Sequence, residues 1–179
     1  TCLPSDPLWL KQVHGSAVVD ADGDGSGLQA MYLDPPQADA SCTSVPGRVL
    51  AVLTADCLPV VLADDRGTVL GVAHAGWRGL SAGVLENTLA QMRMRQPAAT
   101  GFRAWIGPGI GPAAFQVGDD VRQAFEGRGA DQSDCFVPDP GSPGKWLADL
   151  PRLAQRRLNR AGVAHVELSG LCTVTDPSQ

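Results

Sequence analysis

The chain has 179 residues, of which 44% are hydrophobic and 18% are charged, and its formal net charge at pH 7 is -5. This length suits one compact domain that buries roughly two thirds of its unfolded surface, and the composition excludes collagen, a disordered chain and a disulfide scaffold. The scattered lysines and arginines argue against a nucleic-acid partner, because binding to nucleic acid needs a basic face.

Neither a membrane span nor a signal peptide is visible in the sequence. The longest apolar run, residues 58–63, is far shorter than the ~20 residues that cross a bilayer. The chain also opens without a basic segment followed by an apolar one. The five cysteines are odd in number and widely spaced, which favours reduced thiols over disulfide pairs. We therefore expect a cytoplasmic protein without a membrane partner.

The first half of the chain predicts strands and loops. An extended stretch covers residues 7–19, and the acidic run at residues 20–27 is a loop by composition. Strands are expected at residues 39–42, 49–53, 58–63 and 69–73, with a hairpin turn between the last two. The nearly continuous apolar character of those last two strands indicates that both of their faces are covered.

The second half of the chain alternates between helices and strands. The expected elements are a helix at residues 81–96, a strand at 102–106, a short helix at 119–126, a surface loop at 132–144, a helix at 149–161 and a strand at 163–168. The whole pattern predicts a single α/β domain of the α+β type, with mixed β-sheets flanked by helices.

His14, Cys57 and His74 stand in neighbourhoods that set them apart from the third histidine and the other cysteines. His14 interrupts an extended stretch, Cys57 lies between two predicted strands, and His74 follows one; strand ends are where α/β proteins place reactive groups. Two nitrogen ligands and one sulfur ligand, with a fourth position left to water, make the arrangement of a catalytic zinc site. The spacing alone matches no short metal motif, so a structural role for each residue stays open.

The same three residues allow two other interpretations. Cys57 could be the nucleophile of a cysteine hydrolase or deamidase, with His74 or His14 as the general base. The chain could also be a binding module without catalysis, for example one that checks cell-wall precursors. Metal content and product formation separate these alternatives.

Six short motifs occur in order along nearly the whole chain. They are WLKQVHG at residues 9–15, ADA at 38–40, LTADCLPV at 53–60, GVAHAGWRG at 71–79, WIGPGIGP at 105–112 and LCT at 171–173. Together they resemble the YfiH-like family, also called the laccase-domain, polyphenol oxidase or peptidoglycan-editing-factor family. The resemblance implies that residues 1–179 form one YfiH-like catalytic domain, in which His14, Cys57 and His74 bind one zinc ion.

The resemblance also implies purine nucleoside chemistry. The expected reactions are phosphorolysis of adenosine, inosine, guanosine and methylthioadenosine, and hydrolytic deamination of adenosine, so the expected partners are a purine nucleoside and phosphate. Copper is not expected, because three histidines cannot build the several copper centres of a multicopper oxidase. Family members usually carry further N- and C-terminal segments, which we expect this chain to lack, and phosphate-binding arginines could lie there.

Five further residues are candidates for the site. Arg78, counted with the three ligands as catalytic, could hold an anion, and Trp77 could stack a base or belong to the core. Gln12 is expected to contact substrate or to lie at a sheet edge, and Gly109 to bring backbone near the ligand. Asp56 could orient a histidine ligand or pair with Arg78.

The remaining polar features are expected to be structural. The run from Asp20 to Gly25 matches the opening of an EF-hand, but its twelfth position is Met31 rather than glutamate, which indicates an acidic surface turn. His165 and Cys172 are likewise interpreted as structural.

Overall fold

A computed structural model describes residues 3–23, 25–126 and 132–176. The strands are β1 Pro7–Leu8, β2 Val18–Asp20, β3 Ala40–Thr43, β4 Val49–Leu50, β5 Leu58–Asp64, β6 Leu70–Ala75, β7 Phe102–Ile106, β8 Gln116–Val117, β9 Phe136–Pro138, β10 Trp146–Ala148 and β11 His165–Leu168. The helices are α1 Gly25–Leu33, α2 Trp77–Ala82, α3 Val84–Arg95, α4 Asp119–Phe125 and α5 Leu150–Arg160, and a 3-10 turn covers Ser133–Cys135.

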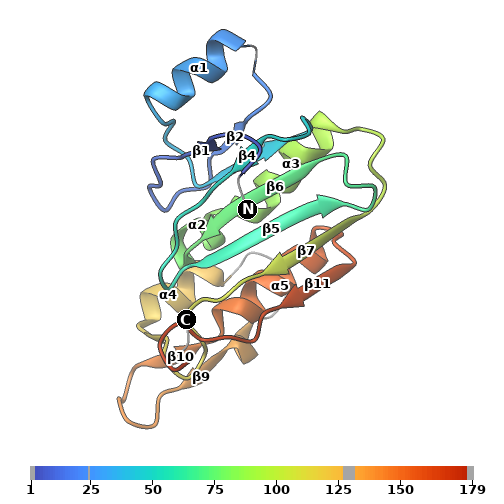
Figure 1. The fold of residues 1–179 in the computed structure, drawn as a ribbon. Helices are drawn as coiled ribbons and strands as arrows, with labels where there is room; N and C mark the ends of the chain where they lie inside the picture. Colours follow the sequence, from blue (N-terminus) through green and yellow to red (C-terminus); the bar gives the residue numbers. More distant parts are fainter. Residues whose placement is uncertain (1–2, 24, 127–131, 177–179) are drawn as a thin grey trace.

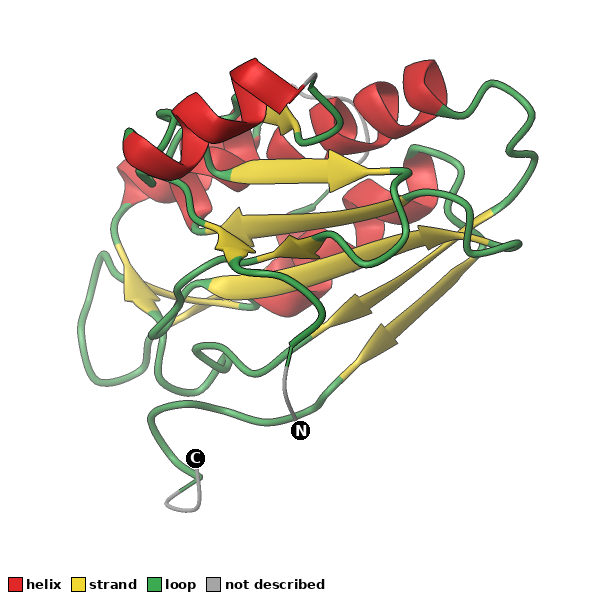
Figure 2. Cartoon of the chain, turned by 45° about the horizontal axis from the view of Figure 1, so that its top comes forward, coloured by secondary structure: helices red, strands yellow, loops and turns green. Residues whose placement is uncertain are grey.

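A mixed sheet of six strands organises the domain, in the order β11-β7-β5-β6-β3-β2. Its four inner strands pair antiparallel, while β11 and β2 are added in parallel at the two edges. Helices α2, α3 and α5 pack on one face of this sheet (Figures 1 and 2). Strands β1 and β4 form a small parallel pair, and β8, β10 and β9 form a second, antiparallel sheet. The prediction of an α+β domain with mixed sheets is confirmed.

The core lies between the six-stranded sheet and its helices. Strand β5 alternates buried residues with half-buried ones, and its buried residues, such as Leu62, join one cluster with Leu89 and Met92 of α3. Gly71 of β6 permits the close approach of α3, because a Cβ there would lie 2.8 Å from the sulfur of Met92. Successive residues of a strand point to opposite faces. His74, paired with Pro59 of β5, therefore points away from the helical layer.

The strands and the last helix expected in the middle and C-terminal parts of the chain are present, with shifts of one or two residues. Strands β5, β6 and β7 and helices α4 and α5 confirm the periodic segments, and Asp149 caps α5 by accepting the N–H of Arg152 at 2.9 Å. Strand β6 is buried on both faces, as expected. For β5 that expectation is wrong, because one of its faces is only half-buried.

Three expectations about segment type are wrong in part. The helix expected at residues 81–96 is two helices that begin at Trp77, separated by Gly83 in the left-handed conformation with φ +100°. Helix α1 begins at Gly25, inside the run expected to be a loop. The loop expected at residues 132–144 begins with a 3-10 turn and strand β9, because Cys135 and Phe136 are buried in the core.

The expected strand at residues 49–53 is confirmed only in part, since β4 ends at Leu50. None of the helices in the described part of the chain is long and apolar enough to cross a membrane.

The core position of Leu89 gives a first prediction. Replacing this fully buried residue with alanine leaves a cavity beneath the sheet, so Leu89→Ala should lower the free energy of unfolding by about 2–5 kcal/mol. Urea denaturation measures this loss. Met94 lies on the same helix with 67% of its surface exposed, and Met94→Ala is the matched control. Equal losses in the two variants would contradict the proposed packing of α3.

Candidate metal centre

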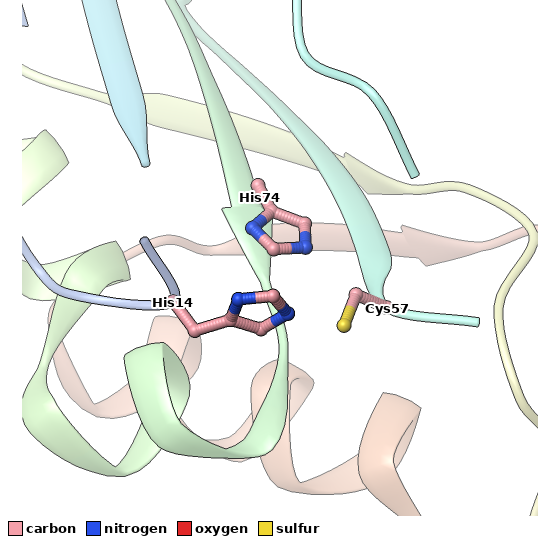
Figure 3. A group of neighbouring side chains, drawn as sticks. All are labelled: His14, Cys57 and His74. Atoms are coloured by element: carbon pink, nitrogen blue, oxygen red, sulfur yellow. The ribbon is translucent and has the colours of Figure 1, made fainter. Parts of the chain in front are cut away.

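The structure brings His14, Cys57 and His74 together from three separate segments (Figure 3). One potential ligand atom from each residue lies within 4.8 Å of the other two. The two imidazole rings meet edge to face, with their centroids 4.8 Å apart. His74 is buried in β6, Cys57 is half-buried just before β5, and His14 is exposed in the segment between β1 and β2. The donor set of two imidazoles and one thiol, with an exposed side, fits a metal ion that keeps an open position.

Glycines keep the space around these three side chains free. A Cβ at Gly76 would lie 2.7 Å from the sulfur of Cys57 and 3.3 Å from Cδ2 of His14. A Cβ at Gly79 would lie 2.6 Å from the backbone oxygen of Gly15, so this glycine lets α2 approach the segment that carries His14. Both glycines of the HAGWRG sequence are therefore required by close contacts at the site.

The carboxylate of Asp39 organises two of the three residues. It accepts hydrogen bonds from the backbone N–H groups of Val13 at 3.2 Å, His14 at 2.9 Å and Gly15 at 2.7 Å. Its Oδ1 also lies 2.8 Å from Nδ1 of His74. Burial acts to raise the pKa of Asp39, but the hydrogen bonds from His74 and the three N–H groups together lower it, so the group is a carboxylate.

Asp56 does not orient a histidine, so that sequence-based expectation is wrong. Its Oδ1 accepts the hydroxyl hydrogen of Thr173 at 2.7 Å, and its backbone oxygen accepts the N–H of Ile110 at 2.8 Å. The alternative pairing with Arg78 is absent too. The residue that does orient a histidine, Asp39, lies in the ADA motif, and no signal in its local sequence reveals the role.

Gly109 packs against the segment that contains Cys57. A Cβ at this position would lie 2.6 Å from Cδ2 of Leu58 and 3.2 Å from the backbone oxygen of Asp56. Its own backbone oxygen accepts the N–H of Thr173 at 3.0 Å. These contacts give Gly109 a packing role beside the site. They bring the WIGPGIGP and LCT motifs against the segment that contains Cys57.

The two ends of the Gln12 side-chain amide bind the backbone of Leu53. The amide nitrogen donates to the Leu53 oxygen at 2.8 Å, and the amide oxygen accepts the Leu53 N–H at 2.7 Å. The Gln12 side chain therefore holds the segment after β4, and neither Gln12 nor Leu53 lies in a strand.

Trp77 and Arg78 begin helix α2, directly after the turn that follows His74. The Trp77 side chain is half-buried and packs against the core cluster, while the guanidinium carbon of Arg78 lies 4.5 Å from the centre of its ring. Arg78 is exposed, and no carboxylate of the described residues pairs with it.

The pKa of the Cys57 thiol is shifted in the direction opposite to that of an activated nucleophile. Burial, followed by the negative charges of Asp56 and Asp39, raises its pKa. A cysteine nucleophile needs a lowered pKa beside a base. The surroundings of Cys57 therefore do not supply the lowered pKa that an activated nucleophile needs.

Cys172, interpreted from sequence as structural, has the more acidic thiol. Its sulfur accepts the N–H of Gly111 at 3.2 Å. Hydrogen bonds from the Thr175 side chain and from backbone groups including those of Val174 and Gly111 lower its pKa to about 7. Val174 and Thr175 are neighbours of Cys172 in sequence, whereas Gly111 comes from a distant segment.

The acidic turn and the third histidine lie outside the site. Asp22 accepts hydrogen bonds from the Thr43 hydroxyl and from Ser44 N at 2.7 Å, and Asp20 pairs with Arg95 at 2.7 Å. Asp24 is outside the described residues. These contacts occupy the carboxylates with protein partners, in agreement with an acidic turn. His165 is exposed on the edge strand β11.

Comparison with known proteins identifies the family. All of residues 1–179 match the family described as multi-copper polyphenol oxidoreductase laccase. A Xylella fastidiosa protein named purine nucleoside phosphorylase is 46% identical over 99% of this chain and 66% of its own length. The purine nucleoside phosphorylase YfiH of Escherichia coli is 43% identical over 97% of this chain and 66% of its own length.

Solved structures agree with these relatives. A Neisseria meningitidis protein superposes with a TM-score of 0.83 at 41% identity, over 96% of this chain and 66% of that one. YlmD from Geobacillus stearothermophilus gives 0.82 at 29% identity, over 96% of this chain and 65% of that one. The chain therefore belongs to the YfiH-like, laccase-domain family, and it spans 66% of the length of these curated relatives.

The contact of Gly76 with Cys57 gives a second prediction. Gly76→Ala should displace the thiol and weaken metal binding at this cluster by about 10- to 100-fold, the range typical when the surroundings of metal ligands are disturbed. Competition with a chromophoric chelator measures the affinity. Gly23→Ala is the control, because a Cβ there meets nothing within 4 Å. Unchanged affinity in Gly76→Ala would rule out the close contact around the sulfur.

The acidity of Cys172 gives a third prediction. Its thiolate should be present above pH 7 and lost below it, so its alkylation by iodoacetamide should reach half its maximal rate near pH 7. Peptide mapping by mass spectrometry follows each cysteine separately. Cys42 is the internal control, because burial raises the pKa of its thiol to about 12. A midpoint for Cys172 at about 8.5, the value of a free cysteine, would contradict the hydrogen bonding described here.

Proposed function

We propose that this chain is the metal-binding part of a zinc-dependent purine nucleoside phosphorylase that also deaminates adenosine. The observation that carries the proposal is the convergence of His14, Cys57 and His74, within 4.8 Å, in a chain whose relatives at 43% and 46% identity are named purine nucleoside phosphorylases. The substrates are purine nucleosides, namely adenosine, inosine, guanosine and methylthioadenosine, together with phosphate.

Zinc is the metal that this donor set supports best. One thiol and two imidazoles suit zinc, and the chain has only three histidines, too few for several copper centres. A single ion held by His14, Cys57 and His74 accounts for the cluster. The chemistry that zinc supplies when bound at such a site is Lewis-acid polarisation of an oxygen atom.

The protein groups beside the ligands suit the binding of a charged substrate. Arg78 presents an exposed guanidinium that no described carboxylate neutralises, so it is available to hold a phosphate oxygen. Trp77, whose ring lies against the Arg78 guanidinium, is the aromatic side chain to which we assign contact with a base. Gln12 and Gly109 are the other expected substrate contacts. In this proposal they act indirectly, by positioning backbone segments near the ligands.

Product analysis tests this function. The protein in its full natural length is incubated with adenosine, with and without phosphate, and the products are separated by chromatography. Adenine and ribose phosphate, formed only with phosphate, are expected for phosphorolysis, and inosine for deamination. If zinc-loaded protein forms neither product, the proposal is contradicted and the binding module becomes the better account.

Variants assign the reaction to the site. His74→Ala should lower kcat/KM by about 1,000-fold or more, equivalent to ~4 kcal/mol of lost transition-state stabilisation, because it removes a ligand. His165→Ala is the matched control, since this histidine is exposed on the far edge strand and should leave the rate unchanged.

A further inference from the structure

Both histidines of the candidate metal centre are hydrogen-bonded to the carboxylate of Asp39, His14 through its backbone N–H and His74 through its ring. The side chain of Asp39 is fully buried, and its four hydrogen bonds go to groups of the two histidines and their immediate neighbours. These contacts indicate a role for Asp39 at the candidate metal centre.

The first contact fixes the backbone at His14. His14 has φ +58°, and it is the one residue other than glycine with a positive φ among residues 3–23, 25–126 and 132–176. This left-handed conformation is strained for residues other than glycine and persists only where the surroundings impose it. Here the N–H groups of three successive residues, 13 to 15, converge on the Asp39 carboxylate. Such a concave arrangement of N–H groups binds an anion, and Asp39 supplies that anion.

The second contact fixes the ring of His74. Oδ1 of Asp39 lies 2.8 Å from Nδ1, while the backbone oxygen of Asp39 accepts the His74 N–H at 2.7 Å. Because the carboxylate can only accept, the neutral imidazole carries its hydrogen on Nδ1. The lone pair of Nε2 is then the one available to a metal ion.

We propose that Asp39 is the positioning residue of the metal centre, which holds the His14 backbone in its left-handed conformation and His74 in its Nδ1–H tautomer. It acts through the two ligands and touches neither the ion nor the substrate. The part that concerns metal affinity rests on the proposed function, whereas the tautomer and the backbone conformation do not depend on a metal.

A second buried carboxylate, at the turn between β5 and β6, provides a matched control. Asp64 is 2% exposed and accepts the N–H groups of Thr68 at 2.6 Å and Val69 at 3.0 Å, at the turn between β5 and β6. His74 lies towards the other end of β6. Asp39→Asn and Asp64→Asn therefore remove the same charge and disturb similar backbone bonds, but only the first lies against the candidate ligands.

The two variants are compared by their zinc affinity and by the visible spectrum of the Co²⁺-substituted protein. Asp39→Asn should bind zinc about 10- to 100-fold more weakly, the usual effect of removing a carboxylate behind a metal-bound histidine, and should shift the visible absorption bands of the Co²⁺-substituted protein. Asp64→Asn should keep the affinity within about threefold of the unsubstituted protein and leave the spectrum unchanged, even where its Tm falls equally. Equal effects of both variants, or no effect of Asp39→Asn, would overturn the proposal.

The metal-free protein gives a test that needs no variant. Long-range ¹H–¹⁵N correlation spectra distinguish the two histidine tautomers, and His74 should show a protonated Nδ1 and an unprotonated Nε2. The opposite tautomer would overturn the proposal even where Asp39→Asn fails to fold. Failure of the unsubstituted protein to bind zinc would instead contradict the proposed function, while the spectrum would still decide the role of Asp39.

Discussion

The hydrogen bonding of the buried Asp39 carboxylate is the interaction on which the candidate metal centre depends. It joins the segment between β1 and β2, which carries His14, to His74 of β6. A buried carboxylate without partners is costly, and so is a left-handed histidine without support. Each compensates the other, because the strained backbone is what directs three N–H groups at the carboxylate. Two of the three candidate ligands are therefore arranged by the protein itself.

The third candidate ligand, Cys57, is positioned by a different part of the fold. The segment before β5 is hydrogen-bonded to Ile110 and Thr173, and Gly109 packs directly against it. Gly76 in turn leaves room for the sulfur. Motifs that contain no ligand thus contribute to the site through close backbone contacts. Helices α2, α3 and α5 cover only one face of the sheet, which lets His74 point to the other (Figure 1).

The sequence predicts the parts of this molecule whose signals are local. Strands β5 to β7 and helix α5 follow from apolar periodicity and from the Asp149 cap, and the motifs select His14, Cys57 and His74. The sequence does not predict helix α1, because its glycine-rich start has the composition of a loop. The role of Asp39 could not be predicted, since its partners come from segments distant in sequence. The expectation that Asp56 orients a histidine is wrong because its partners, Thr173 and Ile110, also come from distant segments.

Metal analysis of the purified protein tests the central claim most directly. Elemental analysis of the unsubstituted protein, and of variants in which His14, Cys57 or His74 is replaced by alanine, gives the identity and stoichiometry of the bound ion. The account predicts about one zinc per chain, lost or greatly reduced in each of the three variants and retained in His165→Ala. Several copper ions per chain, or zinc that persists when Cys57 is replaced, would contradict it.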